Sequence, residues 1–410
     1  MKKYIIITST IGRMGGAQMY VENKLHYLKA NGWEVQIFYY LYAEKILLPG
    51  LAGYRENYSP ELGVSISSLP KCKIKKVIDK IENIVKPSGD HVIVESQLVG
   101  LALWGELVAK RLHARHVLNL LEERIPLFNE KEHLFYEDKL IKRDILNASI
   151  PRIKSIFASR FKNEYSNYTR SVIIPCTNVV SDSLEIDCRF DKCDFTILSI
   201  GRLDKPYIMG MVEEIVIFAK ANPSLTINLI CIGGSSDGSK EGVIQNMVKD
   251  SNNLKLYLLG YVYPVSRQLI LQANASIACA NSILVSANEG IPTIAIDTID
   301  NMAIGVYGHT TMEKFKRNDE PQQRVSVLLQ QIKDGDYPRD KYKNSGNDEM
   351  ESAFINEFNY VLDNYHTGPY YDVYSICSPI KHILLVIKYL NKTFFLDRMI
   401  NLFICYKEQK

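Results

Sequence analysis

Short apolar runs alternate with amphipathic stretches along the first part of the chain. An apolar run at residues 4–8 is followed by the glycine-containing sequence GRMGGA, by residues 18–32 with apolar side chains at helical spacing, and by a second apolar run at residues 34–40. Further apolar runs lie at residues 91–95, 116–121 and 171–175. Runs that are apolar throughout are typical of strands buried on both faces, so the pattern predicts a parallel sheet covered by helices.

The same alternation begins again at Phe195. The apolar runs cover residues 195–203, 225–234, 254–260, 275–280 and 293–297, and helical periodicity is found at residues 211–222, 241–250 and 264–274 and after Asn281. This second cycle predicts a second doubly wound parallel sheet.

A polar, acidic stretch at Val180–Asp194 separates the two cycles and is typical of an interdomain linker. We therefore predict an α/β protein with two doubly wound, Rossmann-like domains, over residues 1–185 and 186–365. Domains of this kind bind ligands outside the carboxyl ends of their parallel strands. The cleft between two such domains facing each other is thus the expected ligand site.

The last segment, residues 366–410, is predicted to be a basic amphipathic helical tail. It carries six basic and three acidic residues, and apolar residues recur at helical spacing from Ile380 to Leu390. Such a helix can lie in an anionic membrane interface, which predicts a peripheral membrane contact through residues 380–406. The alternative interpretation is that the tail packs on the first domain.

Composition and charge agree with this organisation and exclude two classes of protein. The 410 residues exceed what one core usually supports, and 46% hydrophobic against 23% charged residues exclude a disordered chain. Lys and Arg number 49 against 46 Asp and Glu, a formal net charge of +3. That charge is too small for a dedicated nucleic-acid-binding protein, so no nucleic-acid partner is expected.

The sequence also lacks the patterns of metal-binding, disulfide-rich, secreted and membrane-spanning proteins. Eight cysteines occur without a CxxC pair and eight histidines without HxxxH or HExxH spacing, so neither a zinc site, a disulfide framework nor another metal site is expected. The first apolar run is too short for a signal peptide, and no stretch approaches the roughly 18–20 uncharged apolar residues of a membrane span. These features predict a cytoplasmic protein without a resident cofactor.

The first candidate for chemistry is the turn Gly12–Ala17, which follows a predicted strand and opens a predicted helix. Glycines there let a phosphate or sugar approach the backbone, and the helix start offers N–H donors. The alternative is a tight turn without a ligand. The turn is not GxGxxG, and Tyr39 and Tyr40 rather than an acid end the second strand, so a nicotinamide-dependent oxidoreductase is disfavoured.

The second candidate is Ser199–Lys205, SIGRLDK, at the end of the first strand of the second cycle. Arg202 offers a planar fork and Lys205 a point charge, a combination that suits a diphosphate. The alternative is solvated surface charge.

The order of these motifs resembles that of the family 4 retaining glycosyltransferases, which have the two-domain GT-B fold. The motifs that carry the resemblance are GGA, IIPCTNV, ILSIGRLDK, LTINLICIGG, LGYV and EGIPTIAID, and they extend over roughly residues 3–365. The resemblance implies a nucleotide diphosphate sugar as donor and transfer with retention of configuration.

By this resemblance, Arg202 and Lys205 hold the donor diphosphate and Gly15 and Gly16 line the cleft close to it. Gly233, at the end of LTINLICIGG, contacts the donor sugar or nucleotide. The family in general needs no bound metal ion, because positive side chains neutralise the departing phosphate. In most members a glycine follows the lysine, whereas Pro206 follows it here.

The sequence departs from the family between Ala273 and Pro292. The family usually has two glutamates there, the second five positions before the glycine of Gly-x-Pro, and Gly290 places Val285 at that position. Glu289 is the only nearby carboxylate, so we assign it to the donor sugar or nucleotide. The missing glutamates motivate an alternative function: a non-catalytic binding or scaffold protein with the same fold.

Asn281 or Ser282 is predicted to cap the helix that follows residues 275–280. The N–H groups behind such a cap can receive a phosphate, which makes both residues candidates for diphosphate binding. The alternative is a cap with no ligand.

Two strand ends of the first domain carry candidate carboxylates. Glu122 and Glu123 end the strand that begins at His116, where the family often has a His or Asp facing the donor sugar. A carboxylate there can steady positive charge that develops at the sugar carbon, and the alternative is a helix start. The strand end Val94–Gln97, which contains Glu95, is a second candidate for contacts with donor or acceptor hydroxyls.

The leading hypothesis is therefore a hexosyltransferase that moves a sugar from a nucleotide diphosphate sugar to a polysaccharide or lipid-linked glycan. Capsule or other cell-surface polysaccharide assembly, in the cytoplasm or at the inner face of the cell membrane, fits this activity by analogy. A nucleotide-sugar epimerase shares the fold and stays an open alternative.

Overall fold

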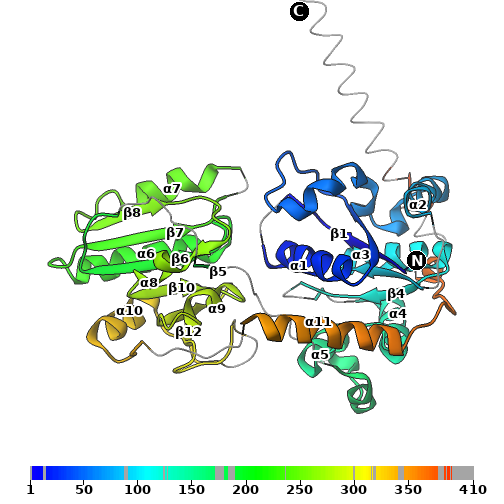
Figure 1. Ribbon diagram of the computed structural model, residues 1–410. Coiled ribbons are helices and arrows are strands. Elements are labelled where there is room, and N and C mark those ends of the chain that lie inside the picture. Colours follow the sequence, from blue (N-terminus) through cyan, green and yellow to red (C-terminus); the bar gives the residue numbers. More distant parts are fainter. Residues whose placement is uncertain are drawn as a thin grey trace, which may run out of the picture. The chain divides into compact units, whose positions relative to one another are not determined.

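The computed structural model describes most of the chain in two compact units (Figure 1). The first unit comprises residues 1–13, 17–174 and 351–410, and the second comprises residues 14–16 and 175–350. The described residues are 2–12, 15–86, 91–122, 125, 126, 128–170, 180–182, 190–235, 237–298, 301–314, 316, 320–339 and 346–376, together with 383, 384, 386, 387 and 389.

The first unit is built on a parallel sheet of four described strands. These are β1 (Lys2–Thr8), β2 (Trp33–Tyr39), β3 (His91–Ser96) and β4 (Arg115–Leu118), in the order β2-β1-β3-β4. The main helices are α1 (Gly16–Ala30), α2 (Lys71–Val85), α3 (Val99–Leu112), α4 (Glu130–Ile141), α5 (Ile150–Phe157) and α11 (Gly346–Asp363). Short 3₁₀ turns lie at Pro49–Asn57, Pro60–Gly63, Ile66–Ser68, Ala158–Arg160, Asn163–Tyr168 and Val373–Ser375.

The second unit contains a six-stranded sheet of order β12-β11-β10-β6-β7-β8. Its strands are β6 (Phe195–Ile200), β7 (Ile227–Ile232), β8 (Leu254–Leu258), β10 (Ala275–Ala278), β11 (Thr293–Ile296) and β12 (Ala303–Val306), all parallel except β12. Its helices are α6 (Tyr207–Ala221), α7 (Ser239–Val248), α8 (Arg267–Leu271), α9 (Ser282–Ala287) and α10 (Val325–Asp334). A separate pair joins β5 (Val180–Ser181) to β9 (Val265–Ser266).

The apolar runs predicted the described strands of both sheets except β12, which no predicted run covers and which runs antiparallel to β11. Two other expectations differ from the structure, and one falls outside the described residues. The run at residues 171–175 lies outside the described residues. Val180 and Ser181, the start of the predicted linker, pair with β9 of the second unit, so this part is structured. The predicted helix at residues 264–274 is shortened to α8, because Val265 and Ser266 form a strand first.

The helix α11 belongs to a different domain from the one predicted. The predicted second domain extended to residue 365, whereas the residues of α11 from Glu351 onward group with the first unit. Its aromatic side chains explain the difference. Phe354 stacks on Tyr27 with ring centroids 5.3 Å apart, and Phe358 lies 5.7 Å from the rings of Tyr4 and Trp33. Burial of these rings fixes α11 on β1, β2 and α1.

A buried ion cluster joins α11 to the sheet of the first unit. The Lys24 ammonium, from α1, forms ion pairs with Glu95 of β3 and Glu357 of α11, and none of the three side chains is more than 2% exposed. Tyr4 donates to Glu95 Oε2 over 2.6 Å, and Tyr20 donates to Glu357 Oε1 over 3.2 Å. Glu95 therefore acts as an internal ion-pair partner.

The two carboxylates of this cluster respond differently to burial. Burial raises the pKa of Glu357, the neighbouring Glu95 raises it further, and Lys24 opposes both effects. Burial also acts on Glu95, but Lys24 and the hydrogen bonds from Tyr4 and Gln97 outweigh it and lower the pKa of this carboxyl. Glu95 is thus the carboxylate that keeps its charge beside Lys24.

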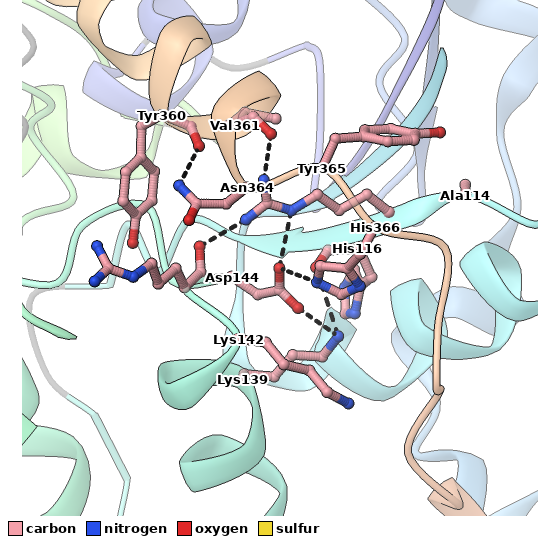
Figure 2. A network of polar contacts seen from close by, with 12 residues as sticks. Ala114, His116, Lys139, Lys142, Asp144, Tyr360, Val361, Asn364, Tyr365 and His366 are labelled. Atoms are coloured by element: carbon pink, nitrogen blue, oxygen red, sulfur yellow. Dashed lines mark hydrogen bonds and ion pairs between the residues drawn. The ribbon is translucent and has the colours of Figure 1, made fainter. Parts of the chain in front are cut away.

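A second buried network centres on Asp144 (Figure 2). Arg115 Nε donates to Asp144 Oδ1 over 2.9 Å, Lys139 Nζ donates to Oδ2 over 3.2 Å, and His366 Nε2 lies 3.1 Å from Oδ1. Arg115 also donates to the carbonyl oxygen of Val361, the end of α11. Asp144 and Arg115 are fully buried, so the network fixes β4 and the end of α11 together.

His116 extends the Asp144 network, because Lys139 also forms an ion pair with Glu106, the partner of His116. Its Nδ1 lies 2.7 Å from Glu106 Oε2 and its Nε2 lies 3.0 Å from Ser96 Oγ. Because the carboxylate can only accept, Nδ1 carries the proton and Nε2 accepts from the Ser96 hydroxyl. This is the order of groups in an acyl-transfer triad, but all three side chains are buried, and a Cβ on Gly105 would lie 1.9 Å from Ser96 Oγ. No space for a substrate remains beside Ser96, so these three side chains hold β3, β4 and α3 together.

Replacing Lys24 with methionine should lower the free energy of unfolding of the first unit by about 3–5 kcal/mol, because Glu95 and Glu357 then face each other without a cation. Glu357→Gln should lower it by only about 1 kcal/mol, since Lys24 keeps Glu95 as partner. Urea unfolding followed by tryptophan fluorescence measures both, because Trp33 and Trp104 are the only tryptophans and both lie in the first unit. A larger loss for Glu357→Gln than for Lys24→Met would contradict this account.

Acid should destabilise the first unit partly through His116. Burial and the Lys139 ammonium lower the pKa of His116 against the opposing effect of Glu106. The unfolded chain therefore takes up the proton first, and stability present above the unfolded pKa of roughly 6.5 falls as the pH drops, by up to about 1.4 kcal/mol per pH unit. The free energy of unfolding at about pH 7.5 and about pH 5.5 measures this loss.

In the His116→Gln variant, the free energy of unfolding should differ less between the two pH values than it does in the wild-type protein. His26→Gln, which changes an exposed histidine on α1, is the matched control and should retain the wild-type difference. Equal differences in all three proteins would exclude His116 as the titrating group.

Candidate functional site

The predicted diphosphate-binding pair lies on the loop that leaves the carboxyl end of β6. Arg202 follows Gly201 directly after the strand, and its Nε lies 3.6 Å from Asp204 Oδ1, with 27% of the arginine side chain exposed. The backbone N–H of Lys205 donates to the Arg202 carbonyl over 3.3 Å, and α6 begins two residues later at Tyr207. The turn between strand and helix therefore holds both residues at one end of the sheet.

Gly233 lies at the neighbouring strand end, and packing accounts for its lack of a side chain. Its φ is +134°, and a Cβ would lie 2.0 Å from the carbonyl oxygen of Gly201. Its N–H donates to the Gly260 carbonyl over 2.7 Å, which joins the end of β7 to the loop after β8. The glycine lets the loops after β6, β7 and β8 approach closely.

Two further groups shape the loop after β7, and the sequence analysis did not assign them a role. Glu241, in the first turn of α7, accepts from the Ser235 N–H over 2.8 Å and from the Ser235 hydroxyl. Tyr261 donates its hydroxyl proton to the Gly234 carbonyl over 2.9 Å. An acidic residue in a first helical turn is a general signal for such a contact, whereas the Tyr261 bond joins two strand ends and has no local pattern.

The loop between β10 and α9 carries the next two candidates. Asn281 stands at the N-cap position of α9, as predicted, but its backbone angles are helical and its side chain makes no capping hydrogen bond. Instead, Asn281 Oδ1 accepts from Lys314 Nζ over 3.1 Å, and Ser282 is the first residue of the helix. Lys314 is a cation at this strand end that no motif in the sequence indicated.

Glu289 follows the other end of α9. Because β11 runs parallel to β10, the chain has returned to the amino edge of the sheet by the time it reaches this residue. Glu289 Oε2 lies 2.9 Å from Arg267 Nε, and Arg267 also pairs with Asp182. Val285, at the position of the family's second glutamate, is buried in α9.

The sheet order shows which candidates share an edge. The strands β10, β6 and β7 are neighbours and parallel, so the loops that follow them lie at the same carboxyl edge. That edge carries Arg202, Lys205, Gly233, Asn281 and Ser282. Glu289 lies at the opposite edge of the sheet and is engaged with Arg267.

The turn that leads into α1 contains one glycine that packing requires and one whose surroundings are open. A Cβ on Gly12 would lie 1.9 Å from Ala43 Cβ, so packing requires this glycine. A Cβ on Gly16, the first residue of α1, would meet nothing within 4 Å, and the first turn of α1 has no acidic side chain. Gly16 itself therefore leaves room for an anionic group beside the N–H groups at the start of α1.

Glu122 lies after β4 and binds the start of another helix. Its carboxylate oxygens accept from the Val99 N–H of α3 over 2.9 and 3.2 Å, and Arg152 donates to its backbone carbonyl. Burial raises the pKa of Glu122, and the bond from Val99 opposes this effect. The carboxylate thus stabilises α3, while Glu123 lies outside the described residues.

Neither a metal-binding cluster nor a membrane-spanning helix is found among the described residues. Nowhere in this part of the chain do three His, Cys, Asp or Glu side chains form a group able to hold a metal ion. None of the described helices combines the length and apolarity that a membrane span requires.

No protein-family model matches the sequence, and no curated protein is similar to it in sequence. Solved structures are similar in fold. The apo form of the lipopolysaccharide outer core galactosyltransferase WaaB aligns with a TM-score of 0.51 and 15% identity over 88% of this chain and 99% of that chain. HepE from Anabaena, in complex with UDP and glucose, aligns with a TM-score of 0.51 and 13% identity over 94% and 99% of the two chains.

The UDP-GlcNAc 2-epimerase from Neisseria meningitidis, bound to UDP-GlcNAc, also aligns with a TM-score of 0.51, at 11% identity over 88% of this chain and 100% of that chain. At these identities the similarity concerns the fold, so membership of glycosyltransferase family 4 stays a prediction. With its two parallel α/β units, the chain has the GT-B fold of two Rossmann-like domains.

Proposed function

We propose that the protein is a glycosyltransferase that uses a nucleotide diphosphate sugar as donor. The observation that carries the proposal is the position of Arg202 and Lys205 on the loop leaving β6, at the carboxyl edge of the central strands of a GT-B second domain. Ligands of doubly wound sheets bind at this edge. A guanidinium fork and an ammonium there suit the two phosphates of the donor.

The chemistry that these cations would supply is charge neutralisation. Departure of a nucleoside diphosphate leaves negative charge on the phosphate oxygens, and a positioned Arg or Lys lowers the free energy of that state. Gly15 and Gly16 are proposed to contact the diphosphate through the backbone. Glu122 and Glu123 are proposed to face the positive charge at the sugar carbon, although the bond from Val99 already engages Glu122.

The names of the similar structures favour a uridine donor as the first probe. HepE was solved with UDP and glucose, and the Neisseria meningitidis epimerase with UDP-GlcNAc. We propose retention of configuration and a polysaccharide or lipid-linked acceptor, in the cytoplasm or at the inner face of the cell membrane. The support for these finer points is the family resemblance of the sequence.

One observation favours a second function, the binding of a donor without transfer. Val285 is buried where the family has a glutamate, and Glu289 is paired with Arg267. Val285 has no carboxylate, and Glu289 lies at the opposite edge of the six-stranded sheet, so neither residue places a carboxylate at its carboxyl edge. A GT-B protein without this carboxylate can still bind a nucleotide diphosphate through Arg202 and Lys205.

Saturating UDP or UDP-glucose should raise the unfolding temperature of the wild-type protein. Ligand at about a hundred times its dissociation constant adds roughly 2.7 kcal/mol, which corresponds to about 5–10 °C for a domain of this size. Arg202→Ala should abolish the shift, and Arg202→Lys should restore only part of it, because lysine keeps the charge without the fork. Thermal unfolding with and without nucleotide measures all three proteins.

Arg324→Ala is the matched control, since it removes another arginine of the same unit that is paired with a carboxylate, Glu214. It should retain the full shift. Release of UDP from UDP-glucose then separates the two functions: turnover that Arg202→Ala abolishes supports the transferase, and binding without turnover supports the binding protein. The absence of a shift with any of the uridine, guanosine, adenosine and cytidine nucleotides would refute both.

A further inference from the structure

A cavity of about 1080 Å³ lies on the first unit, away from the strand ends discussed above. Its walls are α2, the last turn of α3 and residues 365–374. Its lining combines apolar side chains, among them Ile74, Ile78 and Leu107, with the lysines Lys71 and Lys75. Apolar and cationic side chains side by side suit an anionic amphiphile.

The helix α2 presents a dense set of cations beside this cavity. Its exposed lysines are Lys71, Lys73, Lys75, Lys76 and Lys80, which we name the α2 basic face. The opposite side of the helix is an apolar stripe of buried residues, Ile74, Val77, Ile81 and Val85. The stripe anchors α2 on the core, so the lysines are held on a rigid support that faces solvent.

The acidic side chains of α2 do not balance these lysines. Asp79 Oδ1 lies 3.3 Å from Arg111 Nη2, and Glu82 Oε2 lies 2.8 Å from Arg111 Nε. Arg111 comes from α3, so both carboxylates of the cavity lining are used by a cation outside α2. The α2 basic face therefore keeps an excess of positive charge.

Apolar side chains are exposed on the same unit. Ile383, Leu384 and Ile387 belong to the described helical residues after position 376, and 57%, 61% and 48% of their surfaces are exposed. Tyr389 packs against the hydrophobic cluster that also contains Ile74 of α2. Lysine side chains and exposed aliphatic side chains together are the two components of an interfacial binding surface.

We propose that the α2 basic face docks the protein on a membrane rich in anionic phospholipid, with the cavity accepting part of a lipid. The phosphates of the lipid surface would lie against the lysines, and the side chains of Ile383, Leu384 and Ile387 would enter the interface. A nucleic acid fits less well, because the face is built of lysines rather than arginines that pair with phosphates in a fork, and exposed Ile and Leu have no role on a phosphate backbone.

This inference does not depend on the proposed transferase activity, because binding to vesicles needs neither donor nor turnover. The full-length protein is mixed with vesicles of phosphatidylcholine alone, or with roughly 30% phosphatidylglycerol, and the bound fraction is measured by sedimentation. The wild-type protein should bind the anionic vesicles and not the neutral ones. Binding should weaken as salt screens the lysines.

The variant Lys71→Gln/Lys73→Gln/Lys75→Gln/Lys76→Gln should bind anionic vesicles at least tenfold more weakly, because each lysine near an anionic surface contributes roughly a factor of five. The matched control is a second quadruple variant of exposed lysines, in which the second unit loses the same charge; it changes Lys220, Lys249, Lys255 and Lys333 to glutamine. It should bind as the wild-type protein does. Near-ultraviolet circular dichroism checks that both variants are folded.

Ile383→Ser/Leu384→Ser/Ile387→Ser tests the apolar component and should also weaken binding to anionic vesicles. Equal losses in the two lysine variants would overturn the proposal, since net charge alone would then explain binding. Wild-type protein that does not bind anionic vesicles would overturn it as well. The same conclusion follows if the α2 lysines bind a DNA or RNA oligonucleotide in preference to the vesicles.

Discussion

The burial of Lys24 between two carboxylates is the constraint on which the first unit depends. The Lys24 side chain is fully buried, so its ammonium requires Glu95 and Glu357 in fixed positions. These residues lie on α1, β3 and α11, and almost the whole second unit lies between β3 and α11 in the sequence. The ion cluster can form only when α11 packs on the sheet of the first unit. The first unit is therefore complete only after the chain has passed through the second unit and supplied α11.

Local patterns predicted most of the fold, because an apolar run of five or six residues reports on the burial of the strand that contains it. The assignment of α11 could not be predicted in this way. Its contacts are with Tyr4, Tyr27 and Trp33, more than three hundred positions earlier, and an amphipathic helix does not indicate which sheet it covers. Linker composition also failed at Val180 and Ser181, where backbone pairing with β9 decides the structure.

Some residues of the candidate site could likewise be placed from the sequence, and others could not. Arg202 and Lys205 could be placed from the sequence, because the end of a parallel strand defines the edge at which the next residues lie. Asn281 and Glu289 could not, since their contacts are with Lys314 and Arg267 from other loops. A carboxylate or amide near a strand end is informative only when the cations that can engage it are known.

Burial decides which of these charges can reveal a function by mutation. Removal of one partner from a buried pair such as Lys24 and Glu95 leaves an uncompensated charge and costs about 3–5 kcal/mol, so loss of folding hides any other role. Exposed ion pairs contribute about 0–1 kcal/mol, and Arg202 or the α2 lysines can be changed without unfolding the unit that carries them. The buried charges therefore explain the fold, and the accessible cations at the edge of β6 and on α2 are the positions where binding can be measured.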